Sequence, residues 1–234
     1  MCMQKLKTAL IAAGIITLIA AAAGFGYYIY QGLNYFSTQN ASVTSDMVTL
    51  TPEITGRLKE WNVQVGDQVK AGQILGRQEV SSMVSSTALS PNNLANSADI
   101  IIAKADIKAP IDGKVVMANV VKGQVLSPGM EIATIADTAH MYVKANIEET
   151  DIFNIQPGQT VDIKIDAYPR QNFKGSVDSI GQATASAFNT SISLTTSGTY
   201  SKVTQLIPVH IAIVNPDNLT LMPGMNATVK IHIN

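Results

Sequence analysis

The chain has few charged residues, few aromatic residues and one cysteine. Asp, Glu, Lys and Arg make up 14% of its 234 residues, whereas an ordinary soluble domain has about 25%. The net charge of −1 and the 6% of aromatic residues argue against a nucleic-acid-binding protein, which needs a basic surface and often stacking platforms. Because Cys2 is the only cysteine, an internal disulfide framework and a cysteine-ligated metal cluster are excluded.

The chain also has no catalytic or metal-binding motif. It has no nucleophile elbow, P-loop or dinucleotide-binding glycine motif. Three histidines stand too far apart for a zinc signature: His140, His210 and His232. Asp162 and Asp166 flank Lys164 on one face of a predicted strand, which indicates a solvated face rather than an acid/base pair. We therefore expect no enzyme, no cofactor, and no catalytic, cofactor-binding or metal-binding residue.

A long hydrophobic run lies near the N-terminus. Residues 8–30 contain no charged residue, and their helix would be about 34 Å long, enough to cross a bilayer. Lys5 and Lys7 precede the run, and no basic residue follows until Arg57. The positive-inside rule then predicts a single-pass inner-membrane protein with a cytoplasmic N-terminus and a periplasmic or otherwise extracytoplasmic bulk.

The outer end of this run carries tyrosines at positions 27, 28 and 30, as expected for an interfacial aromatic belt. A cleaved signal peptide is the alternative, because Ala21 and Ala23 could form a cleavage site before Gly24. We favour the retained anchor because the apolar stretch continues past that site.

Two segments repeat one pattern at a spacing of 57 residues. Three glycines keep this register: Gly56, Gly66 and Gly72 recur as Gly113, Gly123 and Gly129. Apolar residues recur around them, and glycine at such positions supplies the positive φ of tight turns. Neither half could bury its apolar face alone, so the repeat predicts two β units interleaved as a flattened β-sandwich.

The repeated segments, 52–75 and 110–132, resemble the halves of a biotinyl/lipoyl-like domain. Behind one N-terminal membrane helix, such a split pair is similar to the membrane fusion, or periplasmic adaptor, proteins of the HlyD/EmrA type. A carrier domain of this fold would hold its modified lysine on the hairpin between the halves. Residues 80–98 contain no lysine, and Lys104 lacks the Asp or Met neighbours of such a site. We therefore expect neither lipoylation nor biotinylation.

The segment between the halves is short and uncharged. The resemblance implies a long coiled-coil hairpin here, which needs sustained apolar heptads with charged flanks. Residues 80–98 have neither, so the hairpin is predicted to be absent or vestigial. A flexible polar loop and a short helical hairpin both fit the sequence, and contact with an outer-membrane channel stays an open question.

The C-terminal part alternates apolar and polar residues with the period of half-buried strands. The segments are 142–147, 160–165, 207–213 and 227–233. Residues 148–155 have helical spacing, with a cap near Thr150 and an end at Pro157–Gly158. We expect a small antiparallel β-barrel of about five strands with one short helix.

This region resembles the barrel of the same family, and residues 181–208 look most like the EmrA branch, which implies drug efflux with a major-facilitator transporter. Residues 179–201 carry no charge and are rich in Ser and Thr. Our hypothesis is a loop that contacts a partner near the transporter, and the alternative is an ordinary surface excursion.

The sequence therefore predicts a mainly β chain with a transmembrane helix, a split biotinyl/lipoyl-like sandwich and a β-barrel. Its expected parts are a cytoplasmic N-terminus (1–7), the transmembrane helix (8–30), a linker (31–45), the first lipoyl-like half (46–79), a short bridge (80–104), the second half (105–138) and the barrel (139–234).

The predicted function is a non-catalytic adaptor subunit of a multidrug efflux or secretion system, coupling an inner-membrane transporter to the exit path. The expected partners are a transporter, of the major-facilitator class in preference to the ABC class, and further copies of the chain, but no nucleic acid. The alternatives are an envelope-anchored structural or binding module without a transporter, and a lipoyl or biotin carrier domain.

Overall fold

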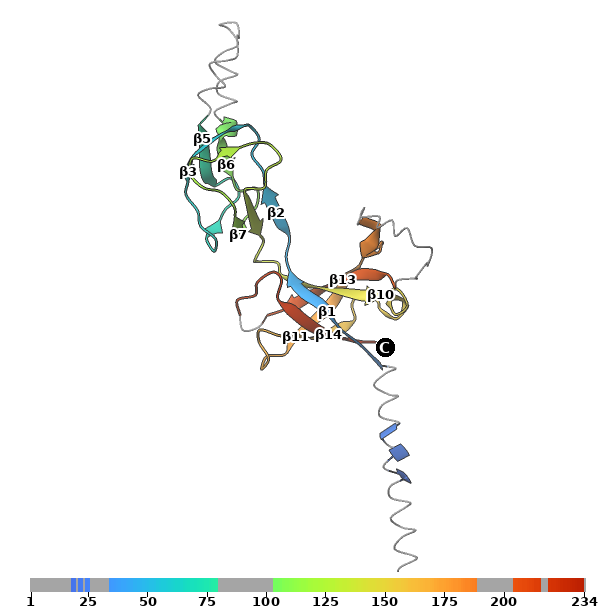
Figure 1. Cartoon of the computed structure of the whole chain (residues 1–234). Helices are drawn as coiled ribbons and strands as arrows, with labels where there is room; N and C mark the ends of the chain where they lie inside the picture. The colour runs from blue at the N-terminus through green and yellow to red at the C-terminus, as the bar shows by residue number, and fades with distance from the viewer. Residues whose placement is uncertain are drawn as a thin grey trace, which may run out of the picture. The chain divides into compact units, whose positions relative to one another are not determined.

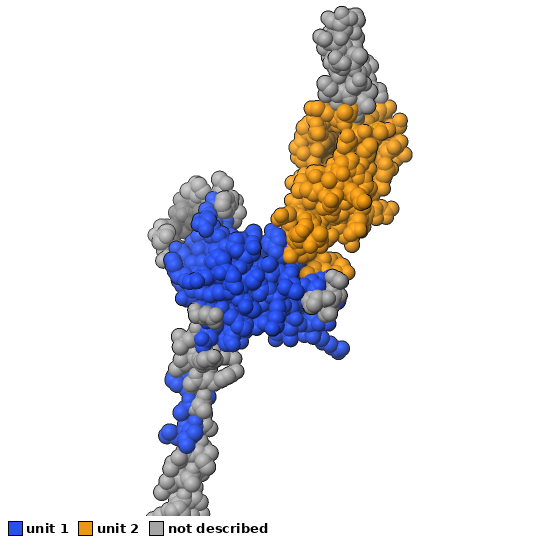
Figure 2. Space-filling model, turned by 180° about the vertical axis from the view of Figure 1, so that it is seen from behind, with its two compact units in different colours: residues 1–43, 142–219, 224–234 blue, residues 44–141, 220–223 orange. Residues whose placement is uncertain are grey.

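The computed structural model describes residues 34–79, 103–188, 204–215 and 219–233, with six further positions between 18 and 25. The described part contains no helix that is both long and apolar enough to span a membrane. Most of the predicted transmembrane helix, residues 80–102 of the predicted bridge (80–104) and residues 189–203 lie outside the described residues. The chain forms two compact units, coloured separately in Figure 2.

One unit is a closed six-stranded barrel, with the strand order β1-β10-β13-β12-β11-β14. Its strands, labelled in part in Figure 1, are β1 (Tyr35–Thr44), β10 (Tyr142–Glu148), β11 (Thr160–Ile165), β12 (Phe173–Ile180), β13 (Leu206–Val214) and β14 (Asn226–His232). Alternate residues point inward, and Val143, Ile163 and Ile211 among them are fully buried. The structure confirms the four alternating segments as strands and adds two more.

The predicted linker at 31–45 is wrong for residues 35–44, which form β1. This strand pairs with β14 and closes the barrel. The alternation in β1 is hidden by a register shift between Thr38 and Ala41, and only Ala41 and Val43 are buried. Without β1, the edges of β10 and β14 would expose unpaired backbone groups.

The predicted helix at 148–155 is also wrong in kind and extent. Strand β10 continues to Glu148, and only a 3₁₀ turn, η1 (Ile152–Asn154), fits before Pro157. Its N-cap is Asp151 instead of Thr150, with no side-chain cap hydrogen bond. A second 3₁₀ turn, η2 (Ala185–Phe188), lies within the uncharged segment 179–201.

The other unit contains two four-stranded sheets, in the orders β2-β9-β7-β4 and β6-β5-β3-β8. Its strands are β2 (Met47–Leu50), β3 (Gly56–Trp61), β4 (Gln68–Val69), β5 (Ile74–Glu79), β6 (Asp106–Lys108), β7 (Gly113–Ala118), β8 (Val125–Leu126) and β9 (Ala133–Ala136).

The two sheets exchange their edge strands. Strand β4 of the first half pairs with β7 of the second, and β8 of the second half pairs with β3 of the first. A shift of 57 residues carries β3 onto β7 and β4 onto β8. The structure thus confirms the predicted interleaving of two equivalent β units.

The turns before the exchanged strands repeat the same hydrogen bonds. The Gly66 N–H donates to the Val115 carbonyl and the Gly123 N–H to the Leu58 carbonyl, both at 2.8 Å. Both glycines have positive φ, 103° and 90°. A residue with a Cβ is strained there, so these glycines are required by backbone conformation.

A common core lies between the sheets. It contains the fully buried Leu58, Leu75, Leu126, Ile132 and Ile135. Both halves contribute to it, as they must if neither buries enough apolar surface alone. Trp61 lies partly buried against this core.

We expect Gly123→Val to lower the free energy of unfolding by about 1–2 kcal/mol, because valine is strained at positive φ. Thermal unfolding of the purified full chain in detergent measures the loss, and Gly66→Val should match it. Gly123→Asn is the control and should lose less, since asparagine tolerates this conformation. An unchanged melting temperature for Gly123→Val would contradict this role of the turn.

Candidate functional site

The histidines and carboxylates of the described chain do not converge on one site. His140 contacts Asp137 at 2.7 Å and His232 contacts Asp162 at 2.8 Å, while His210 stacks on Tyr142 with ring centroids 4.9 Å apart. Among the described residues, no group of three or more His, Cys, Asp or Glu side chains could hold a metal ion.

The strand residues weighed as an acid/base pair are separated by the structure. Asp162 lies on β11 and pairs with His232 of β14, whereas Asp166 follows the end of β11 in a turn. Lys164 lies between them and is exposed. This arrangement is a solvated outer face of the barrel, without an enclosed position for a substrate.

Lys104, the lysine nearest to the bridge, forms an ion pair with Glu53 at 3.6 Å. Its side chain is half exposed, at 48%. The lysine lies beside the start of β6 instead of at a hairpin tip. Lys104 is therefore not placed as the modified lysine of a carrier domain.

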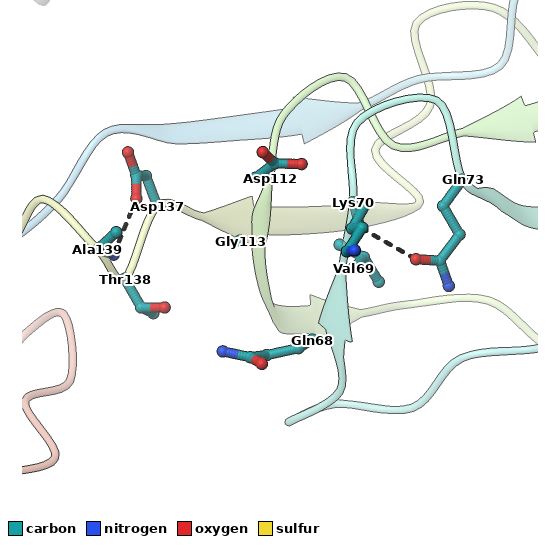
Figure 3. Close-up of a pocket in the computed structure, with 9 residues that line it drawn as sticks. All are labelled: Gln68, Val69, Lys70, Gln73, Asp112, Gly113, Asp137, Thr138 and Ala139. Carbon is teal, nitrogen blue, oxygen red and sulfur yellow. Dashed lines mark hydrogen bonds between the residues drawn. The ribbon is translucent and has the colours of Figure 1, made fainter.

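A cleft of about 410 Å³ opens on the sandwich unit (Figure 3). Its lining comes from three stretches of chain: 68–73, 112–113 and 137–139. Asp112 accepts a hydrogen bond from the Ala71 N–H at 2.7 Å, and Asp137 accepts one from the Ala139 N–H at 2.9 Å. Both carboxylates accept hydrogen bonds from backbone N–H groups.

The pair Asp137 and His140 borders this cleft. The hydrogen bond with Asp137 raises the pKa of His140, and the same bond lowers the pKa of Asp137. Asp46 adds a smaller attraction to the protonated imidazole. The ion pair therefore exists at pH values between the lowered pKa of Asp137 and the raised pKa of His140. Its contribution to the stability of the fold is lost as the pH rises through the pKa of His140.

The more distinctive surface is found by comparing the two halves of the repeat. At equivalent positions, the second half has exposed apolar residues where the first half has glutamines: Val121, Val125 and Met130 stand for Gln64, Gln68 and Gln73. Val121 and Val125 are 71% and 54% exposed. We call these three apolar residues the β8 edge and the three glutamines the β4 edge.

Equivalent backbone hydrogen bonds form at the two edges. The Gln64 N–H donates to the Asp67 carboxylate at 2.8 Å, and the Val121 N–H donates to the Gln124 side-chain oxygen at 3.1 Å. A polar side chain at either edge is therefore compatible with the fold. The apolar side chains of the β8 edge therefore have no role in folding that the β4 edge shares, and exposed apolar residues on an edge strand can serve as an interaction surface.

No motif in the sequence predicted the β8 edge, the cleft or the Asp137–His140 pair. The 57-residue register could have revealed the first, by a comparison of side-chain polarity across the repeat. The other two depend on contacts between segments far apart in the chain, such as Ala71 with Asp112, and no sequence signal marks them.

Comparisons with known proteins agree with the two units. Residues 46–137 match the family model of a CzcB-like, barrel-sandwich hybrid domain, and residues 141–231 match that of a YknX-like beta-barrel domain. The efflux system component YhbJ of Bacillus subtilis is 38% identical over 218 residues, which are 93% of this chain and 89% of YhbJ.

Two further proteins extend the comparison. The colistin resistance protein EmrA of Acinetobacter baumannii is 33% identical over 133 residues, and the match covers 56% of this chain and 38% of that EmrA. The solved structure of the membrane fusion protein Spr0693 from Streptococcus pneumoniae has a TM-score of 0.58 at 17% identity, covering 86% of this chain and 99% of that one. The second likeness shows the shared fold.

The interleaved sandwich and the closed barrel are thus the two modules of an adaptor architecture. The chain belongs to the HlyD/EmrA-type family of membrane fusion, or periplasmic adaptor, proteins. Proteins of this family are non-catalytic components of efflux systems.

We expect Asp137→Asn to lower the pKa of His140 toward the ordinary imidazole value, because the substitution removes the charged acceptor. NMR titration of the ring protons measures this, since the chain has only three histidines. Asp162→Asn is the matched control: it removes the partner of His232 and should leave His140 unchanged. An unaltered His140 midpoint in Asp137→Asn would show that the pair does not form in solution.

Proposed function

We propose that this chain is the membrane-anchored, non-catalytic adaptor of a multidrug efflux or secretion system. The similarity to YhbJ along 93% of the chain carries the proposal. In this role the chain binds an inner-membrane transporter and couples it to the exit path. Its chemistry in this role is binding, with no bond made or broken.

The favoured partner is a major-facilitator transporter. Relatives named EmrA and MdtN, which are multidrug export or resistance proteins, match 56% and 68% of this chain. The chain spans only 35% to 49% of those relatives, so their substrates and partners enter here as proposals. The uncharged apolar run at 8–30 supports an inner-membrane, single-pass location with a cytoplasmic N-terminus.

Chemical crosslinking in membranes, affinity purification of the tagged full chain in detergent and mass spectrometry test this proposal. We expect an inner-membrane transporter among the crosslinked proteins. The control carries residues 1–33 on an unrelated domain, so that recovery through the anchor alone is measured. Equal recovery with both baits, or none with the full chain, would count against an adaptor.

We propose further that the chain self-associates through the β8 edge. Burial of apolar surface drives such contacts at about 25 cal/mol per Å². A patch of three side chains is small for a stable soluble dimer. Copies anchored in one membrane are held near one another, which raises their effective concentration. A second copy of the chain is therefore the partner that can bind the β8 edge with the smallest buried area.

The double substitution Val121→Gln and Val125→Gln gives the β8 edge the side chains of the β4 edge. We expect weaker self-association, measured by crosslinking and analytical ultracentrifugation in detergent, at an unchanged melting temperature. The matched control, Gln64→Ala with Gln68→Ala, alters the equivalent edge and should leave association as it was. If both pairs of substitutions behave alike, the β8 edge is not the contact.

A further inference from the structure

Phe153 is the most exposed large hydrophobic residue of the described chain, at 84%. It occupies the middle of η1, between the buried residues Ile152 and Ile155. The turn is held by the Ile155 N–H, which donates to the Ile152 carbonyl at 3.0 Å, and by the Gln159 side chain, which donates to the Asn154 carbonyl at 3.2 Å. The phenyl ring is therefore presented outward from a turn that two isoleucines fix to the barrel.

The loop that carries Phe153 lies at one defined end of the barrel. It joins the end of β10 to the start of β11, and the register places Val161 of β11 opposite Ile231 of β14. Tyr35, the first residue of β1, pairs with His232 beside it. The loop and the start of β1 thus share the same end of the barrel, which the strands of Figure 1 allow the reader to follow.

That end of the barrel is tied closely to the hydrophobic run. Only residues 31–34 separate Tyr30, the last residue of the predicted membrane helix, from Tyr35, the first residue of β1. Five residue steps span at most about 18 Å. If the run crosses the bilayer, the start of β1 lies within this distance of its end. The η1 loop then faces the same membrane surface.

We propose that Phe153 inserts into the interfacial region of the phospholipid bilayer. This inference rests on the proposed membrane anchor and adds a second attachment point to it. An aromatic side chain is suited to this depth. The flanking acidic residues Glu148, Glu149 and Asp151 keep the loop at the surface, since charged groups resist entry into hydrocarbon.

Two attachment points restrict the barrel more than one. An anchor joined by a short segment leaves the barrel free to tilt, whereas contact through Phe153 brings the η1 end against the membrane. The partner at this position is a lipid surface. If Phe153 contacts a transporter instead, its probe should be quenched no more than the control probe in vesicles that contain no transporter.

The test uses the full chain with Cys2→Ser and a single new cysteine carrying the fluorophore NBD, reconstituted in phosphatidylcholine vesicles. In Phe153→Cys we expect blue-shifted emission and several-fold stronger quenching by doxyl-labelled lipids than in the control. The matched control is Val214→Cys: Val214 is 60% exposed and lies at the last residue of β13, near the opposite end of the barrel.

Flotation of the vesicles distinguishes the failure of the membrane anchor from the failure of Phe153 insertion. If the chain floats with the vesicles but both probes are quenched equally, or neither is, the insertion of Phe153 is overturned and the anchor stands. If the chain does not float, the anchor and the insertion both fail. Phe153→Ser should keep the wild-type melting temperature, because the exposed ring adds little to the core; a large loss would assign Phe153 to packing instead and overturn the proposal.

Discussion

The sandwich unit depends on the exchange of edge strands between its halves. Each sheet is completed by a two-residue strand from the other half: β4 on β7 and β8 on β3. Without the exchange, each half would leave an unpaired edge and an uncovered apolar face. This mutual dependence explains why both halves are present in one chain, and why their turns repeat the same backbone hydrogen bonds.

The exchange also separates what folding requires from what it leaves free. The turn glycines recur in both halves, and so do buried apolar positions such as Leu75 and Ile132. Side chains on the outer edges carry no such requirement, and there the halves differ in both directions. The three glutamines of the β4 edge correspond to the three apolar residues of the β8 edge, whereas the exposed Val65 and Ile74 correspond to Lys122 and Glu131. Comparing the two halves therefore separates folding from function. Where the backbones are equivalent but the side chains differ, the side chains have a role other than folding.

The sequence predicted the repeat because its signals are local. Glycines at fixed spacing mark turns, and alternation marks strands such as β11, whose bounds are the predicted 160–165. Strand β1 was missed because its polar residues and register shift hide the alternation. The 148–155 helix was wrong because periodicity over eight residues could not reveal that β10 extends to Glu148 and leaves room for one 3₁₀ turn only.

By itself the sequence determined the class of fold, the equivalence of the two halves and the absence of catalytic motifs, because these depend on residue type and spacing along the chain. Tertiary structure alone decided that β1 closes the barrel, that Asp137 shifts the pKa of His140, and that Phe153 lies at the barrel end where β1 begins. These features depend on which distant segments become neighbours. Strand pairing fixes those neighbours, and local residue patterns do not specify them.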